Sequence, residues 1–357
     1  MESTTAASTQ PQVTVGIDTG KQHHVAHAAD ALGRPLGSYR MPTTTAGYRQ
    51  FLSWARGLGQ LILVGIEGPG HYGAGLARHL RGEGITVTEV GRPKRQRTAR
   101  YGKSDDADAA GAAAIVLAGE ALGEPKSADG PAEMVRILRV ARTSAVRARA
   151  KAYTALQDLL VTAPATLREQ LAGFYKDRLI AACEELPEPE ILGSAVDAVI
   201  LAVKALAKRC RELDTEAQRL AQHLDAITAT AAPRLRAVYG VGPDTAATFL
   251  AAIGDNPDRI SSDAAFAKLC GVSPLEASSG KTVRHRLNRG GNRDANRALH
   301  VILVVRLRRH QPTRGYLTRR LAEGKTKNEI KRCIKRYIAR EIFHAVQPPR
   351  TTAKTVA

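Results

Sequence analysis

Four carboxylates stand at positions from which their side chains could converge on one divalent cation. Asp18 and Glu67 each end an apolar run of the sequence. Asp105 and Asp108 open a helical stretch, and their spacing of three residues puts both on one helix face, whereas Asp106 points elsewhere. Hard cations such as Mg²⁺ select oxygen ligands and bridge to phosphate. The quartet therefore indicates Mg²⁺-dependent chemistry on a phosphodiester.

Each carboxylate has a plainer explanation when it is taken alone. Asp18 precedes Thr-Gly-Lys and could simply cap a turn. Asp105 and Asp108 could be the acidic first turn that a helix dipole favours. Glu67 is harder to explain, because a Glu at the end of so apolar a strand is costly to bury without a cation or a partner. Taken together, the four positions favour a metal site.

Ser279 is the candidate nucleophile. It directly precedes Gly280, and because Ser-Gly pairs are common in turns, an ordinary loop serine also fits. Side-chain chemistry does not separate Ser279 from Ser278. A serine hydroxyl is a poor nucleophile until a base or a metal activates it, and His285 has no acidic partner nearby in the sequence. A metal held by the carboxylates is the expected source of activation.

Two basic segments accompany these candidates. The first precedes the aspartate pair and comprises Arg92, Lys94, Arg95, Arg97, Arg100 and Lys103. The second follows Ser279 and comprises Lys281, Arg284, Arg286, Arg289, Arg293 and Arg297. Such side chains could bind phosphates along a nucleic acid and stabilise charge that develops on them. A solvated loop is the alternative explanation for the first segment.

The segment around Gly240 and Gly242 matches the turn of a helix-hairpin-helix motif. Glycines there would let backbone amides approach a phosphate at a helix N-terminus. A tight turn between two helices is the simpler alternative.

Composition narrows the class of protein. The chain has 357 residues, a net charge of +19 and 43% apolar residues, so a large globular core and two or three domains are expected. The charge is typical of proteins that bind DNA or RNA, although ribosomal and membrane-surface proteins share it. Aromatic residues make up only 4%, so base stacking is not the main binding mode. The four cysteines are far apart, and they indicate neither a zinc site nor a disulfide framework.

No secretory signal or long apolar run is visible in the sequence, so a soluble cytoplasmic protein without a membrane partner is expected. Short apolar runs predict strands at 13–18, 24–30, 37–41, 61–66 and 85–90. Helices are expected at 45–57, 73–82, 105–121, 132–160, 295–309 and 326–345, with a linker at 124–131. Strands paired in series and then alternating with helices predict a mixed α/β sheet, followed by a mostly helical region.

A heptad pattern runs through residues 196–227. Its apolar positions alternate spacings of three and four residues, from Val196 to Ile227. This pattern predicts a coiled coil or a long antiparallel hairpin. An amphipathic helix packed on its own domain and an intermolecular coil fit it about equally well.

Together these residues resemble the DEDD-type insertion-sequence transposases with a C-terminal catalytic serine, a family of bridge-RNA-guided recombinases. The family's acidic residues correspond to Asp18, Glu67, Asp105 and Asp108, and its Lys-x-Asp-x-x-Asp-Ala setting begins at Lys103. Its Gly-Ile/Val-Gly-Pro turn falls at 240–243 and its Gly-Asn-Arg stretch at 291–293. The family serine directly precedes glycine, which selects Ser279.

The resemblance implies a fold, a domain order and a reaction. Residues 12–160 would form a ribonuclease-H/RuvC-like domain with a trailing long helix, 161–230 a coiled-coil region and 231–346 a serine-bearing domain, between a flexible lead (1–11) and a tail (347–357). Mg²⁺ held by the carboxylates would assist Ser279 in forming a covalent 5′-phosphoserine with DNA, before strands are exchanged and rejoined. The implied partners are donor and target DNA, a structured bridge RNA, and further subunits in a homodimer or homotetramer.

Two other functions also fit the sequence. A junction-resolving nuclease of the same fold also uses four carboxylates, but its nucleophile is water, so Ser279 would be dispensable. A non-catalytic DNA- or RNA-binding protein would use the helix-hairpin-helix turn and the basic helices alone.

Overall fold

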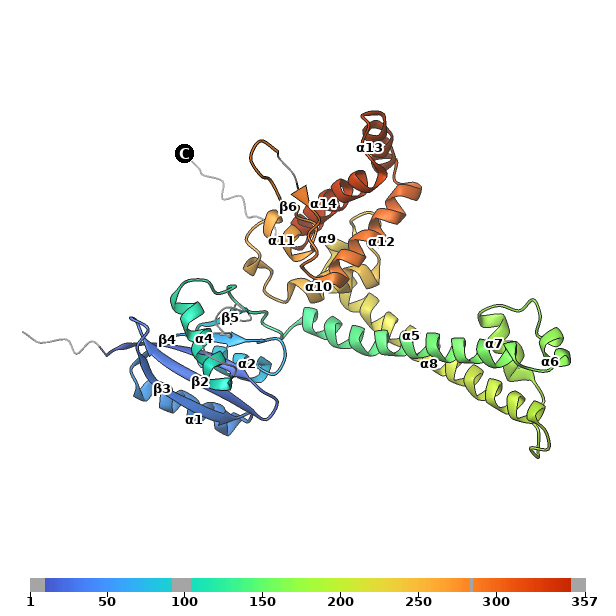
Figure 1. Ribbon diagram of the computed structural model, residues 1–357, viewed down its shortest axis with the longest axis horizontal. Coiled ribbons are helices and arrows are strands. Elements are labelled where there is room, and N and C mark those ends of the chain that lie inside the picture. Colours follow the sequence, from blue (N-terminus) through green and yellow to red (C-terminus); the bar gives the residue numbers. More distant parts are fainter. Residues whose placement is uncertain (1–9, 92–103, 283–284, 348–357) are drawn as a thin grey trace, which may run out of the picture. The chain divides into compact units, whose positions relative to one another are not determined.

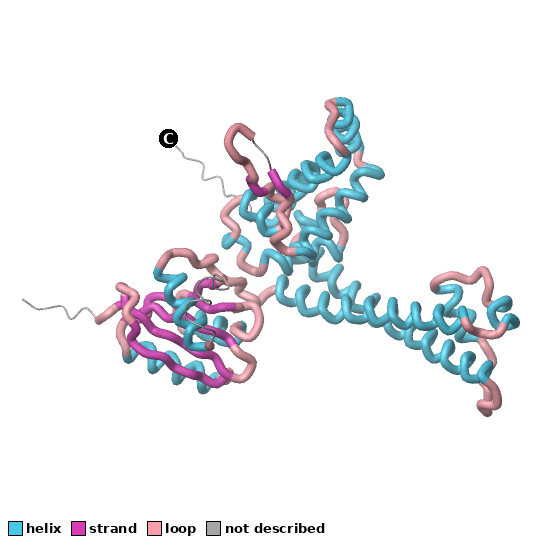
Figure 2. Tube along the Cα trace, viewed as in Figure 1, coloured by secondary structure: helices cyan, strands magenta, loops and turns pink. Residues whose placement is uncertain are grey.

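The computed structural model describes residues 10–91, 104–282 and 285–347. The chain forms two compact units, whose secondary structure is drawn in Figures 1 and 2. The first unit contains residues 1–129 and 254–259, and the second contains 130–253 and 260–357. Each unit has its own apolar core.

The first unit is built on a five-stranded mixed sheet. Its strands are β1 (Gln12–Thr19), β2 (His23–Asp30), β3 (Pro35–Pro42), β4 (Gln60–Glu67) and β5 (Val87–Val90). They lie in the order β3-β2-β1-β4-β5, in which β1 to β3 pair antiparallel and β4 pairs parallel with β1 and β5. This arrangement confirms the mixed α/β sheet expected from the sequence.

Helices cover both faces of this sheet (Figure 1). Helices α1 (Thr45–Gly57) and α2 (Ala74–Gly82) pack on one face, where Val13, Val15 and Ile17 of β1 join their core. Helix α4 (Asp105–Leu117) lies on the other face, directly against Gly16. Because successive side chains of a strand alternate between faces, Asp18 shares the α4 face with Gly16.

The expected linker is tied into the first unit by side chains from distant parts of the sequence. Asn256 donates to the carbonyl of Pro125 (3.0 Å) and accepts from the amide of Ser127 (3.1 Å). Arg81 donates to the carbonyls of Lys126 and Ser127 at 3.2 and 2.7 Å. These bonds fix the backbone just before the second unit begins at residue 130.

The second unit begins with a long antiparallel helical hairpin. Helices α5 (Pro131–Val161) and α8 (Ala195–Ala231) form its arms, and α6 (Ala165–Gln170) and α7 (Asp177–Glu185) lie in the connection. Ala152 and Leu156 of α5 pack against Val203, Ala207 and Cys210 of α8. The heptad positions therefore pack within one chain, which is the hairpin alternative of the sequence interpretation.

The remainder of the second unit is mostly helical, as expected. It comprises α9 (Pro233–Arg236), α10 (Pro243–Ile253), the 3₁₀ turn η1 (Pro257–Arg259, assigned to the first unit), α11 (Asp263–Leu269), α12 (Arg293–Arg309), α13 (Gln311–Ala322) and α14 (Lys327–Val346). The segment between α11 and α12 contains a short hairpin of β6 (Leu275–Glu276) and β7 (His285–Arg286). Among the described helices, none has the length and apolar character needed to cross a bilayer.

Candidate active site and nucleic-acid interface

Asp18 and Glu67 stand side by side at the same edge of the sheet. The parallel register pairs Ile17 with Ile66, so the two carboxylates are the next residues of neighbouring strands. Thr19 continues β1 and donates its hydroxyl to the carbonyl of Glu67 at 2.8 Å, which joins the two strand ends. Both acidic side chains are half-buried. The structure thus brings together half of the predicted acidic quartet.

A pair of glycines sets the distance between this edge and α4. Gly16 and Gly65 are paired in the register, each two residues before its carboxylate. A Cβ on Gly16 would lie 2.0 Å from the amide nitrogen of Ala113, and one on Gly65 would lie 2.3 Å from a methyl of Val116. Only residues without a side chain allow so close an approach. Asp18 and Glu67 therefore face the same side as α4.

The helix carries the other two predicted carboxylates in its first turn. Ser104 caps α4 by accepting a hydrogen bond from the amide of Ala107 (3.2 Å). Asp108 is half-buried, whereas Asp105 is exposed and pairs with Arg40 of β3 at 3.5 Å. In the described part of the chain, no three carboxylate, histidine or cysteine side chains form a group that could hold a metal ion. The full quartet is therefore not assembled around one point.

The donor set is nevertheless suited to Mg²⁺. All four side chains are carboxylates, the ligand class that hard cations select. They lie on one face of the sheet or on the helix that covers that face. The Arg40–Asp105 pair is about two-thirds exposed on both sides, so it contributes little stability and a divalent cation could displace it. Asp18, Glu67, Asp105 and Asp108 are therefore side chains of this unit whose chemistry could serve a divalent cation.

Ser279 lies at the tip of the β6–β7 hairpin. Its amide donates to the carbonyl of Thr282, and the Thr282 amide donates back, each at 3.1 Å. Gly280 occupies the first central position of this two-residue turn with φ +55°, a conformation that L-residues rarely adopt. The serine is exposed, and so is Lys281. A hydroxyl on an exposed turn is accessible to a large substrate such as a nucleic-acid backbone.

The Gly-Asn-Arg stretch after the hairpin has a structural role in two of its three residues. A Cβ on Gly291 would lie 2.7 Å from the carbonyl of Leu269, so glycine is required there. Asn292 caps α12 by accepting from the amides of Asp294 and Ala295, both at 3.0 Å. The third residue, Arg293, is exposed and remains available for a ligand.

A half-buried amide and a half-buried amine hold this helix start in place. Asn296 donates to the carbonyls of Cys270 and Gly271 at 2.8 and 3.2 Å. Its amide oxygen accepts from Nζ of Lys335 on α14 at 2.6 Å, and burial lowers the pKa of that lysine. The network fixes the start of α12 against the end of α11 and against α14.

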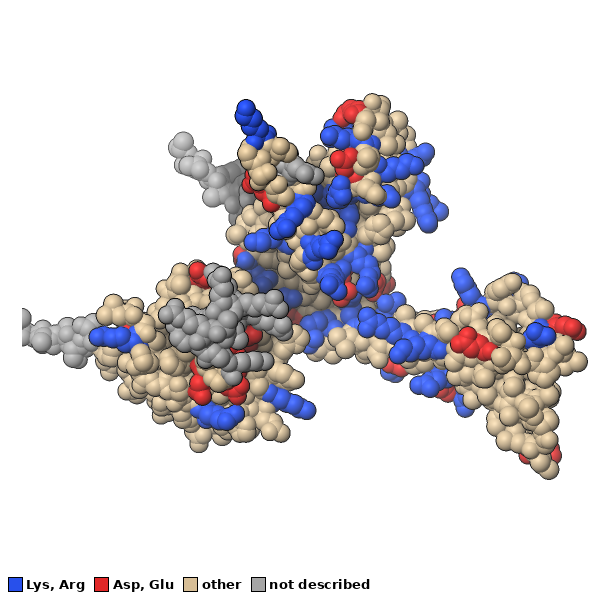
Figure 3. All heavy atoms as spheres, viewed as in Figure 1, with Lys and Arg blue, Asp and Glu red and all other residues tan. Residues whose placement is uncertain are grey.

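A basic cleft of about 960 Å³ lies beside the base of the serine hairpin. Three arginines predicted from the sequence line it, namely Arg286, Arg289 and Arg293. Further cations come from α13, α14 and the turn between them: Arg320, Lys325, Arg332, Lys335 and Arg336. Sequence reasoning gave these five no function, although basic residues recurring every three or four positions along 327–346 are a visible signal. Figure 3 shows how strongly Lys and Arg side chains gather on this unit.

The helix-hairpin-helix turn is closed by bonds of its own. Gly240 has φ +85°, and the Gly242 amide donates to the hydroxyl of Thr245 at 2.9 Å. The buried Arg306 of α12 donates to the Tyr239 carbonyl (2.9 Å) and forms a bidentate pair with Glu341. The turn is therefore well anchored, and its Gly242 amide already has a partner.

Some predicted residues have no structural account. Arg92, Lys94, Arg95, Arg97, Arg100, Lys103 and Arg284 lie outside the described residues. Arg297 is exposed and lies 3.9 Å from Asp294, its neighbour one turn earlier on α12.

Two family models match the chain, one over the segment with the carboxylates and one over the segment with Ser279. Residues 15–163 match the family model of the DEDD transposase of the IS110 type. Residues 232–318 match the model of the transposase IS116/IS110/IS902 family. The chain carries IS110-family transposase domains. A comparison with individual curated proteins found no match.

The two matches divide the candidate residues between them. The DEDD transposase match contains all four carboxylates, and the second match contains Ser279 and the predicted arginines that follow it. These domains mark the chain as an insertion-sequence transposase, an enzyme that binds and rearranges DNA. Transposases with this DEDD domain generally use a divalent metal, typically Mg²⁺. The carboxylate edge of the sheet is the part of the transposase whose donor set suits that ion.

Proposed function

We propose that the chain is a Mg²⁺-dependent DNA recombinase of an insertion sequence, which cuts and rejoins strands through a covalent phosphoserine. The observation that carries the proposal is the placement of Asp18 and Glu67 on neighbouring strand ends, on the sheet face that α4 covers with Asp105 and Asp108. The strand order β3-β2-β1-β4-β5 supports the ribonuclease-H/RuvC-like fold that such chemistry uses.

In the proposed reaction, Ser279 is the nucleophile. Its Oγ forms a bond to the phosphorus as the bond to the 3′ oxygen breaks, and the serine retains the 5′-phosphate. The serine proton is released to solvent, and the departing 3′ oxygen takes up a proton. Attack by a new 3′-hydroxyl then expels the serine and restores a phosphodiester. A bound Mg²⁺ would neutralise charge on the phosphate and lower the pKa of the attacking hydroxyl.

The arginines have a role that follows from their exposure and position. Arg286, Arg289 and Arg293 line the cleft at the base of the hairpin that carries Ser279. Guanidinium groups bind phosphate oxygens with two parallel hydrogen bonds, so they can orient a backbone and stabilise its developing charge. We further propose a structured bridge RNA as a second polyanionic partner and a homodimeric or homotetrameric assembly. The net charge of +19 supports binding of more than one polyanion.

The experiment compares Ser279→Ala with Asp18→Ala on DNA carrying the element junction, in Mg²⁺ and in EDTA. Both variants should lose the covalent protein–DNA adduct, and EDTA should remove it from the unaltered protein. Ser278→Ala is the matched control and should keep the adduct. Cleavage that continues without Ser279 would replace the proposal with a hydrolytic nuclease. Full activity of Asp105→Asn together with Asp108→Asn would contradict any catalytic function of the quartet.

A further inference from the structure

Helix α5 divides its basic side chains between two faces. On one face, Arg142 pairs with Asp244 at 3.0 Å, and Arg149 pairs with Asp177 at 2.5 Å and with Asp214 at 3.3 Å. Arg142 and Arg149, which are seven residues apart, are neutralised by these carboxylates. The ion pairs hold α5 against other helices of its unit. Their role is therefore structural.

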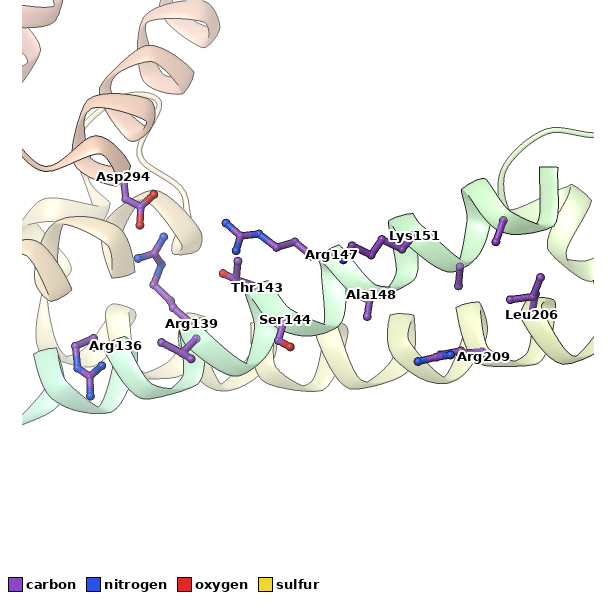
Figure 4. A pocket seen from close by; sticks show the side chains of 13 residues that line it. Arg136, Arg139, Thr143, Ser144, Arg147, Ala148, Lys151, Leu206, Arg209 and Asp294 are labelled. Carbon is purple, nitrogen blue, oxygen red and sulfur yellow. The ribbon is translucent and has the colours of Figure 1, made fainter. Parts of the chain in front are cut away.

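The other face carries Arg139, Arg147 and Lys151 in a row. Within the described residues, none of the three forms an ion pair with an acidic side chain. Spacings of eight and four residues keep them on the same side of the helix. Figure 4 shows all three side chains rising on one side of α5, with Thr143 between them. We call this row, together with Thr143, the α5 rail.

The rail lines a groove of about 930 Å³ between α5, α8 and the first turn of α12. Small side chains form part of its wall, and no aromatic, Asn or Gln side chain is among the described residues that line it. Without aromatic rings the groove offers no stacking platform for unpaired bases. Without amides it has none of the side chains that read adenine in the major groove. These properties, together with the charge of the rail, suit contact with a phosphate backbone rather than with unpaired bases.

The dimensions of the rail fit a double helix. From residue 139 to residue 151 the helix rises about 18 Å, at 1.5 Å per residue. Phosphates of one strand of B-DNA advance roughly 3.4 Å each along the axis, so about five of them span that length. The rail is therefore long enough for its cations to reach several phosphates of a duplex.

One end of the groove is marked by the start of α12. Asp294 is the only carboxylate among the described lining residues, and it lies beside Arg139 (Figure 4). Its charge disfavours a phosphate at that end. The exposed Arg293 precedes it in the sequence and lines the basic cleft near the serine hairpin.

We propose that the α5 rail binds the backbone of duplex DNA. This inference rests on the proposed function, because it supplies a docking surface for the DNA that the transposase rearranges. The rail would hold DNA of any sequence and would leave recognition of a particular site to other contacts. Its charge is matched to phosphate; Arg147 and Lys151 are exposed, and Arg139 and Thr143 are half-buried on the same helix.

The test measures binding of the full chain to random-sequence duplex DNA by fluorescence anisotropy, in EDTA and over a range of salt. The rail variant is R139Q/R147Q/K151Q. The matched control, R178Q/K208Q/R219Q, removes three exposed charges elsewhere in the same hairpin region, and none of them forms an ion pair with another described residue. The rail variant should bind on the order of 10-fold or more weakly, and its slope of log affinity against log salt should fall by about 2 to 3. The control slope should stay near that of the unaltered chain.

A charge-retaining variant separates charge from packing. R139K/R147K/K151R should keep the salt slope, and circular dichroism should show equal helix content in all three variants. Equal slopes for the rail variant and the control would overturn the proposal. So would a rail variant that loses affinity for duplex RNA of the same length but keeps its affinity for DNA. Because the measurement records binding without Mg²⁺, absence of a Ser279 adduct would contradict the proposed function and leave the rail result unaffected.

Discussion

Gly16 and Gly65 are paired on neighbouring parallel strands, and α4 packs directly over both. Each glycine precedes an acidic residue by two positions, so the same register that admits the helix also turns Asp18 and Glu67 toward its face. Gly16 and Gly65 therefore have two effects: they allow α4 to pack closely, and their register places the carboxylates on the face that α4 covers. The predictions for the first unit follow from this relationship.

Gly16→Ala should destabilise the first unit by about 3 kcal/mol or more, because its methyl group would lie 2.0 Å from the Ala113 backbone. Trp54 on α1 is the only tryptophan of the chain and reports on this unit during denaturation. Gly57→Ala is the control, since a Cβ there meets no atom within 4 Å. Equal midpoints for the two variants would show that α4 does not need the glycine.

Arg40→Gln should lower the Mg²⁺ concentration needed for half-maximal DNA cleavage by about two- to five-fold. Arg40 forms an ion pair with Asp105 at 3.5 Å, and removing the arginine leaves the carboxylate available to the cation. A metal titration of cleavage rate measures the effect. Arg34→Gln alters an arginine paired with Asp30 instead, so it should leave the titration unchanged. A higher Mg²⁺ requirement in Arg40→Gln would mean that the arginine assists the site.

Acidification should destabilise the first unit through His24. This side chain is fully buried against Tyr48, and burial, followed by the charge of His23, lowers its pKa below 6.5. The unfolded chain therefore binds the proton first, so stability is fully present above about pH 7 and falls as the pH drops through 6.5. Denaturation followed at Trp54 should show this loss, and His24→Phe should reduce it. An unchanged pH slope in that variant would assign the loss to other groups.

Arg306→Met should destabilise the second unit by about 3 kcal/mol, because it removes a buried guanidinium and leaves Glu341 and the Tyr239 carbonyl without their donor. Thermal unfolding followed by circular dichroism measures the change. Arg308→Met on the same helix is the control, since Arg308 is exposed. A loss of the same size in both variants would point to helix propensity rather than to the buried network.

Periodicity predicted most of the first unit and the long helices. The expected strand at 13–18 is β1, the helix at 45–57 is α1, and the helix at 132–160 is α5, each within one or two residues. These elements are long, and their apolar spacing repeats often enough to be read locally. The helices α6 and α7 were not predicted, because each has at most nine residues and packs against the hairpin rather than forming by itself.

The candidate site was predictable in its residues but not in its assembly. Asp18 and Glu67 were identified from apolar runs, but their adjacency depends on the pairing of β1 with β4. The hairpin of Ser279 was also missed, because β6 and β7 have two residues each and are separated by eight residues in the sequence. The α5 rail was not predicted, because the sequence does not reveal which arginines of α5 have carboxylate partners, as Arg142 and Arg149 do.

The most direct test of the central claim is to identify the residue that carries DNA after cleavage. The protein is incubated with junction DNA and Mg²⁺, the adduct is digested with nuclease, and the modified peptide is sequenced by mass spectrometry. We expect a nucleotide 5′-phosphate on Ser279, within the segment 277–281. A phosphate on another residue, or cleaved DNA with no covalent adduct, would contradict it.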